Sequence, residues 1–314
     1  MNKSTNSSII WCIDPMQDPR ESKNLVLEMQ TWSKRLACQI QPVSIFSENA
    51  LNFPLKTAAV WEKQIEEAVR FSVDQYLKKS EVPNLLPAKI FSVSSLSNRR
   101  FAAEMANFAW QEKAVMICAQ TGAHKTWNPF RLGGFAETLA ATSKVPVLLM
   151  NASSKPSAEN STILFPTDLS DSSKTALHRV IPFAKAANQK VMVYHQTAMQ
   201  IPYLIGFGQP LLVEIPNFDK IAIEIEKENL LRANALVETL RNAQVASAVV
   251  IQKENDGISE QILKFTDDNQ VGLIALVSHS GPWAQAILGG TVQDVILQAK
   301  CPVLVFLQTD TEFI

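Results

Sequence analysis

The sequence contains two copies of one pattern, and this repeat limits the possible folds more than any other feature does. Residues 7–23 align with residues 161–177 at an offset of 154, and residues 130–150 align with residues 286–306 at an offset of 156. The offsets nearly agree, although the two aligned pieces lie at opposite ends of each copy. A chain of 314 residues is long enough for two similar domains, each with its own core.

We therefore expect a first domain over residues 1–150 and a second over residues 162–314. Residues 151–161, "NASSKPSAENS", join them and are rich in Ser, Asn and Ala, with one Pro. This composition predicts a flexible, solvated linker.

Within each copy, short apolar or β-branched runs alternate with longer segments in which apolar residues recur every three or four positions. The runs predict strands and the segments predict amphipathic helices. In the first copy we expect strands at 8–13, 39–46, 88–94, 114–119 and 145–150, and helices at 20–37, 56–79, 97–112 and 134–143. In the second copy we expect strands at 162–167, 190–197, 246–252, 271–277 and 302–307, and helices at 171–188, 217–243, 256–269 and 290–299.

Strands that are apolar throughout and separated by helices pair in parallel, with both faces of the sheet covered. The fold class is therefore α/β, with two tandem, doubly wound, Rossmann-like sandwich domains. Each domain is expected to contain a five-stranded parallel sheet.

Composition excludes several classes of function. Lys and Arg number 29 against 30 Asp and Glu, so we expect neither a nucleic-acid surface nor a polybasic membrane anchor. No apolar run approaches the roughly 20 residues that span a bilayer. The apolar segment near the start is too short for a signal peptide, so we expect none there. The four cysteines contain no C-x-x-C pair, which favours reduced core cysteines in a cytoplasmic protein.

Ligands bind such sheets at the carboxyl ends of the strands, where the strand order reverses. In the second copy, "FPTDLSDSS" (165–173) follows the first strand and "SHSGPWAQAILGGT" (278–291) follows the fourth. The corresponding segments of the first copy are "CIDPMQDP" (12–19) and "AQTGAHKTWNPFRLGG" (119–134).

These residues resemble the universal stress protein family in a tandem arrangement. "ILFPTDLSDSSKTAL" (163–177) is similar to the family's opening strand, acidic residue and serine-rich turn. "LGGTVQDVILQAKCPVLVF" (288–306) is similar to its closing glycine-hydroxyl step, last helix and Pro-Val strand. The resemblance implies an adenine nucleotide alpha hydrolase-like fold, a binding and signalling role in stress, and ATP or AMP with Mg²⁺ as the ligand.

Family members that bind ATP carry Gly, two residues, Gly, nine residues, then Gly followed by Ser or Thr. Glycine lets backbone N–H groups approach phosphate oxygens, and the hydroxyl adds a donor at the positive end of a helix. In the second copy Gly290 and Thr291 match, whereas Val277 and Ser280 stand at the first two glycine positions. Gly281 is one residue late. The candidate nucleotide-binding residues are Pro166, Thr167, Asp168, Val277, Ser278, Ser280, Gly281, Gly290, Thr291 and Val292.

The first copy departs further from the family pattern. Its closing Gly133-Gly134 is followed by Phe135 instead of a hydroxyl residue. The same spacing counted back from Gly133 places Ala123 and Gln120 at the other two glycine positions. We expect a degenerate nucleotide loop here, although Asp14 matches Asp168.

Several of these residues have a second interpretation. Asp168 either faces a ribose or metal or belongs to a turn in which Ser170 or Asp171 caps the following helix, and Asp14 has the same two readings. His195, near a strand end, could touch a base, whereas His178 lies on a helix and favours a surface or packing role. The Ser278-His279-Ser280 run favours a backbone-positioning role over catalysis, because adjacent side chains on a strand point in different directions. His124, in the first-copy loop, has no better claim to a catalytic role.

Residues 199–216 form an apolar, proline-broken loop, which either covers the core or forms a wall for an apolar ligand.

The last strand of each copy is an apolar edge, so the two copies are expected to pair as an intramolecular pseudo-dimer, and a homodimer is a further possibility. Two alternatives to a nucleotide-binding module stay open: a slow Mg-dependent ATP hydrolase, and an adaptor without nucleotide that binds a protein partner or an apolar ligand.

Overall fold

The computed structural model describes residues 7–47, 59–94, 97–121, 132–197, 218–253, 257–278 and 289–307. In the first half the elements are β1 (Ser8–Cys12), α1 (Lys23–Leu36), β2 (Gln39–Ser47), α2 (Ala59–Ser80), β3 (Lys89–Val93), α3 (Asn98–Gln111), β4 (Met116–Thr121), α4 (Leu132–Thr142) and β5 (Val147–Asn151). In the second half they are β6 (Thr162–Pro166), α5 (Asp171–Ala187), β7 (Val191–Gln196), α6 (Phe218–Asn242), β8 (Ser247–Gln252), α7 (Ile258–Asp268), β9 (Val271–Ser278), α8 (Gly290–Gln298) and β10 (Val303–Leu307). Every expected strand and helix is present, with ends that differ by at most three residues.

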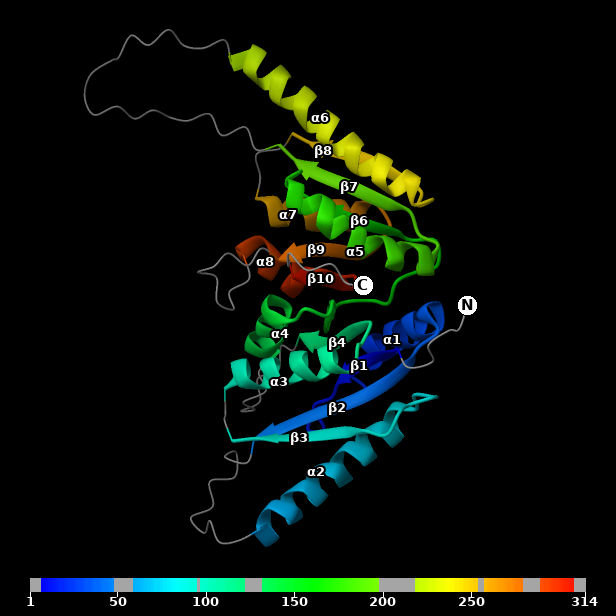
Figure 1. Cartoon of the computed structure of the whole chain (residues 1–314), viewed down its shortest axis with the longest axis vertical. Coiled ribbons are helices and arrows are strands. Elements are labelled where there is room, and N and C mark those ends of the chain that lie inside the picture. The colour runs from blue at the N-terminus through cyan, green and yellow to red at the C-terminus, as the bar shows by residue number, and fades with distance from the viewer. Residues whose placement is uncertain are drawn as a thin grey trace, which may run out of the picture.

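The strands of both halves form one continuous sheet in the order β3-β2-β1-β4-β5-β10-β9-β6-β7-β8 (Figure 1). Pairing is parallel within each half, which confirms the expected five parallel strands. The halves meet where β5 and β10 pair antiparallel, with Val147 opposite Val305 and Leu149 opposite Val303. The apolar last strands therefore pair with each other, as the sequence predicts.

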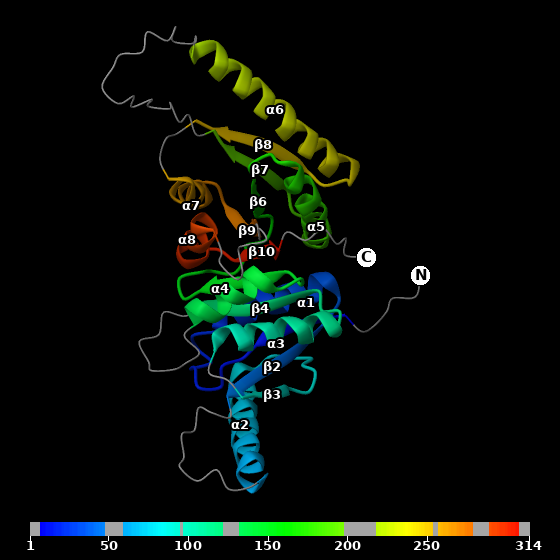
Figure 2. The ribbon, with the colours of Figure 1, turned by 60° about the vertical axis from the view of Figure 1, so that its left-hand side comes forward.

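The apolar core also runs through both halves. One cluster packs α1, α2, α5 and α6 on one face of the sheet, and a second packs α3, α4, α7 and α8 on the other. Figure 2 shows this separation in the second half, where α5 lies opposite α7 and α8. On the first face, the ring of Trp32 in α1 packs edge-on against Phe183 in α5, with centroids 5.6 Å apart. The halves therefore share their two apolar layers, and the division into domains at residues 150 and 162 stays a prediction.

The prediction of a solvated linker is wrong for part of residues 151–161. Ser154 is only 1% exposed and Ser161 is also buried. The Ser154 hydroxyl donates to the carbonyl of Ala299 at 3.0 Å, and its own carbonyl accepts from the Asn24 side chain at 2.9 Å. The serines that look like linker residues in the sequence thus satisfy backbone groups at the joint between the halves.

Gly272 in β9 is required by this close approach. A Cβ atom at position 272 would lie 1.9 Å from the Ser161 hydroxyl oxygen and 2.5 Å from its Cβ. We expect Gly272→Ala to lower the free energy of unfolding by about 1–3 kcal/mol, the range typical of an overpacked core. Chemical denaturation followed by circular dichroism measures this change, and Gly257→Ala is the control because its added Cβ makes only ordinary contacts at 3.7 Å. Equal stability of the two variants would contradict the close contact.

Candidate functional site

The sheet reverses its strand order between β6 and β9 in the second half, because β6 is the first strand of this half and β9 the fourth. The two strands are parallel, with Leu164 opposite Ile274. Because β6 ends at Pro166 and β9 at Ser278, the turn that contains Asp168 follows the same carboxyl edge of the sheet. Helix α8, which begins at Gly290, packs on one face of the sheet and α5 on the other. Doubly wound folds bind ligands at this point of the sheet.

The structure places eight of the ten candidate residues around this edge. Pro166 is the last residue of β6, Thr167 and Asp168 form the turn after it, and Val277 and Ser278 end β9. Gly290, Thr291 and Val292 form the first turn of α8. Ser280 and Gly281 lie outside the described residues, as do His279 and His124.

A relay of hydrogen bonds holds the turn after β6. The N–H of Leu169 donates to the Thr167 hydroxyl at 2.9 Å, and that hydroxyl donates to Ser173 at 2.7 Å. The Ser173 hydroxyl donates to Oδ1 of Asp168 at 2.8 Å, and the N–H of Ser170 donates to the same oxygen at 3.0 Å. The last two of these bonds fix the carboxylate of Asp168 in the turn after β6.

The sequence predicts that Ser170 or Asp171 accepts hydrogen bonds from the first turn of α5, and this prediction is wrong. Ser170 does occupy the N-cap position of α5, but its side chain makes no capping bond there. Its hydroxyl lies 2.6 Å from that of Ser172, and Asp171 forms an exposed ion pair with Lys174 at 2.9 Å. Asp168, two residues earlier, takes the Ser170 N–H instead. The N-cap position of α1 is Ser22 and not Asp14. Oδ1 of Asp14 accepts from the N–H of Met16 at 3.0 Å, within the turn after β1.

His195 lies at the end of β7 and is tied to the same turn. Its Nδ1 is 2.9 Å from the carbonyl oxygen of Thr167. A carbonyl can only accept, so Nδ1 carries the hydrogen. The ring therefore supports the turn from the β7 side, and contact with a base stays a prediction. His178 is exposed on α5, in agreement with a surface role.

Among the described residues, nothing crowds the glycines at the start of α8. A Cβ atom added to Gly289 or Gly290 would meet no described atom within 4 Å. Gly289 has an ordinary φ of −58°, which any residue can adopt. Among the described residues, neither packing nor backbone conformation requires glycine here, although glycine weakens a helix by about 1 kcal/mol relative to alanine. The free N–H groups of a helix start and their positive dipole favour an anion at this position.

At the equivalent position of the first half, the side chain of Gln120 near the end of β4 is bonded to the turn after β1. Its Oε1 accepts from the Ser22 hydroxyl at 2.9 Å and from Nε2 of Gln17 at 3.2 Å, while its Nε2 donates to the carbonyl of Glu21 at 3.0 Å. The Tyr76 hydroxyl extends the network by donating to Ser22 at 2.8 Å. The sequence marks Gln120 as a departure from glycine, but it does not reveal that the side chain binds the turn after β1.

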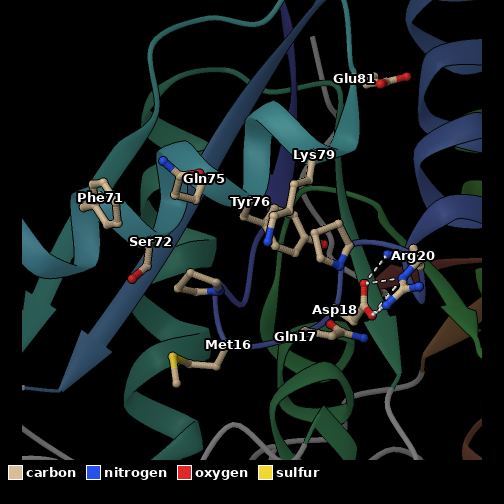
Figure 3. A pocket seen from close by; sticks show the side chains of 12 residues that line it. Met16, Gln17, Asp18, Arg20, Phe71, Ser72, Gln75, Tyr76, Lys79 and Glu81 are labelled. Carbon is tan, nitrogen blue, oxygen red and sulfur yellow. Dashed lines mark hydrogen bonds and ion pairs between the residues drawn. The ribbon is translucent and has the colours of Figure 1, made fainter.

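Sequence reasoning missed an open cavity of about 910 Å³ beside this turn (Figure 3). It is lined by Pro15, Met16, Gln17, Asp18, Pro19, Arg20, Phe71, Ser72, Gln75, Tyr76, Lys79 and Glu81. Arg20 and Asp18 form an ion pair at 2.8 Å on its rim, and hydrogen bonding to Arg20 lowers the pKa of Asp18. The cavity depends on how α2 packs against the turn, which no local pattern encodes.

The described residues contain no cluster of three or more His, Cys, Asp or Glu side chains that could hold a metal ion.

All four cysteines are free, as expected. Burial raises the pKa of Cys38 to about 11 and that of Cys301 to about 12, so these thiols stay protonated. Within the described part of the chain, no helix is long and apolar enough to cross a membrane.

Comparison with known proteins adds a family match. Residues 159–306 match the model of the universal stress protein family. A universal stress protein from Archaeoglobus fulgidus DSM 4304 superimposes with a TM-score of 0.62 at 15% identity over 98% of both chains. A protein of unknown function from Pseudomonas aeruginosa PAO1 gives a TM-score of 0.55 at 13% identity, over 97% of this chain and 93% of that one. Both share the fold of the whole chain. No curated protein sequence matches it.

Proposed function

Because residues 159–306 match the model of the universal stress protein family, we propose that the protein binds an adenine nucleotide in that half and acts as a cytoplasmic stress-response binding and signalling protein. The observation that carries this proposal is the glycine pair at the start of α8, which no described atom crowds. The turn that holds Asp168 after β6 supports it. The ligand would be ATP or AMP, with Mg²⁺ accompanying the triphosphate.

In this proposal the phosphates lie against the first N–H groups of α8, at Gly290 and Thr291, where the helix dipole favours negative charge. Ser280 and Gly281 would contribute from the preceding loop. Asp168 would face the ribose or the metal, because it lies at the same edge of the sheet as Ser278. Pro166, Thr167, Val277, Ser278 and Val292 would line the site.

We propose a binding role for this site instead of hydrolysis. Oδ1 of Asp168 already accepts two hydrogen bonds from its own turn. This carboxylate would therefore hold the turn in place in addition to contacting a ligand. The first half would bind no nucleotide, because Gln120 occupies the position at which the family pattern has its first glycine. Each chain would then carry one nucleotide at most.

We expect Gly290→Val to weaken binding of Mg-ATP and AMP by about tenfold or more, because the side chain would block charge-assisted hydrogen bonds worth roughly 1.5–3 kcal/mol. The fold should persist, since the space around this glycine is open among the described residues. Isothermal titration calorimetry measures affinity, and circular dichroism checks the fold.

Gly257→Val is the control, because it places the same side chain at the start of a different helix, α7. Failure of the wild-type chain to bind either nucleotide would overturn the proposal. Release of phosphate from bound ATP, lost in Gly290→Val, would instead establish the hydrolase alternative.

A further inference from the structure

Glu28 is a buried acid at the joint between the two halves. It lies on α1 with 0% of its surface exposed. Oε1 accepts from the indole Nε1–H of Trp32 at 2.7 Å, and Oε2 accepts from the backbone N–H of Ser157 at 2.6 Å. Ser157 belongs to the segment that joins the halves, so Glu28 connects α1 to residues 129 positions further along the chain.

The hydroxyl of Ser157 makes two short contacts with oxygen atoms. It lies 2.7 Å from Oε1 of Glu28 and 2.7 Å from the carbonyl oxygen of Gly272 in β9. A serine hydroxyl has one hydrogen to donate, and a carbonyl oxygen can only accept. If Glu28 were ionised, one of the two contacts would bring two oxygen atoms together with no hydrogen between them.

A proton on Glu28 supplies the missing hydrogen. The Glu28 O–H then donates to Ser157 Oγ, and the Ser157 O–H donates to the Gly272 carbonyl. Every short contact contains one hydrogen, and Oε1 of Glu28 can still accept from Trp32. We propose that Glu28, Ser157 and the Gly272 carbonyl form a protonated clasp that joins α1, the linking segment and β9, and that loosens when pH rises.

The surroundings agree with a neutral acid. Burial raises the pKa of Glu28, while the hydrogen bonds from Ser157 and Trp32 and the charge of Arg35 oppose that rise. Arg35 is on the same helix and stacks over the Trp32 ring at 5.2 Å. Cys118 of β4 and Cys301 before β10 also face Glu28, and burial keeps both thiols neutral. Arg35 is thus the one charged group among these neighbours.

The sign of the pH effect follows from linkage. A carboxyl group whose pKa is higher in the folded state than its usual value of 4.5 binds more protons when folded. Its contribution to stability is complete below the usual pKa and is lost as pH rises through the folded pKa. On ionisation the Ser157 hydrogen turns to Glu28, and the buried Gly272 carbonyl loses its donor. Across this window the unfolding constant should rise by up to about tenfold per pH unit.

The test uses the full-length protein labelled with ¹³C at glutamate side-chain carboxyls. Difference infrared spectra at pH 7 should show a protonated carboxylic acid band that disappears in Glu28→Gln and remains in Glu159→Gln. Glu159 is the matched control because it lies on the same segment and is exposed. A folded wild-type protein with no acid band at pH 7 would overturn the proposal.

Ser157→Ala provides a second measurement if Glu28→Gln does not fold. The acid band should shift in frequency, because the acid loses the oxygen to which it donates. The wild-type protein should also lose its stability advantage over Ser157→Ala as pH rises through the transition. An unchanged band, or a stability difference that is constant with pH, would contradict the clasp.

Discussion

Leu304→Ala is expected to lower the free energy of unfolding by about 2–5 kcal/mol, the usual range for a large-to-small change in a core. Leu304 is 0% exposed at the centre of β10, where it pairs with Leu148 of β5 on one side and Ala275 of β9 on the other. The cavity that this substitution creates would lie between the two halves. The lost packing should therefore destabilise both halves together.

Tryptophan fluorescence can measure this coupling. Five of the six tryptophans lie before residue 151, whereas Leu304 lies in the second half. In guanidinium chloride, the fluorescence midpoint and the circular dichroism midpoint should fall together in Leu304→Ala. The control is Leu297→Ala on α8, where the side chain is 46% exposed and truncation should cost little. A fluorescence midpoint that stays at the wild-type value would mean that the halves unfold independently.

Trp32→Ala is expected to lower the free energy of unfolding by about 3–5 kcal/mol, because it removes a large aromatic side chain that is buried between the two halves. The ring is fully buried, packs against Phe183 of α5 and donates to Glu28. The substitution leaves a cavity and also removes a donor from a buried acid, so both effects lower stability.

Two further variants separate these contributions. Trp32→Phe keeps most of the apolar contact but loses the N–H, and it should cost about 1–3 kcal/mol. Trp110→Ala is the control, since Trp110 is 43% exposed on α3. Thermal and chemical denaturation measure all three variants. If Trp32→Ala and Trp110→Ala were equally stable, the packing between α1 and α5 would not support the joint.

Much of the fold follows from local patterns. The helix expected at 171–188 is found at Asp171–Ala187, and the strand expected at 302–307 is found at Val303–Leu307. Apolar periodicity decides these elements because each must bury one face or both. The pairing of β5 with β10 is predictable for the same reason, since both are apolar edges.

Contacts between distant residues are not predictable in this way. A glutamate in an amphipathic helix is normally exposed, yet Glu28 is buried because Ser157 and Trp32 supply its hydrogen-bond partners. The amide of Gln120 binds the turn after β1 through residues roughly 100 positions away. Both depend on tertiary packing, which a one-dimensional pattern does not contain.

The antiparallel pairing of β5 with β10 joins the two halves of the sheet, and both strands belong to one covalent chain. In an assembly of separate subunits, such a contact would be lost on dilution, because its stability depends on protein concentration. Here the connecting segment keeps the two strands at a high effective concentration, so the joint forms equally well in a dilute or a crowded solution. The expression level of the protein therefore cannot regulate the pairing of its two halves.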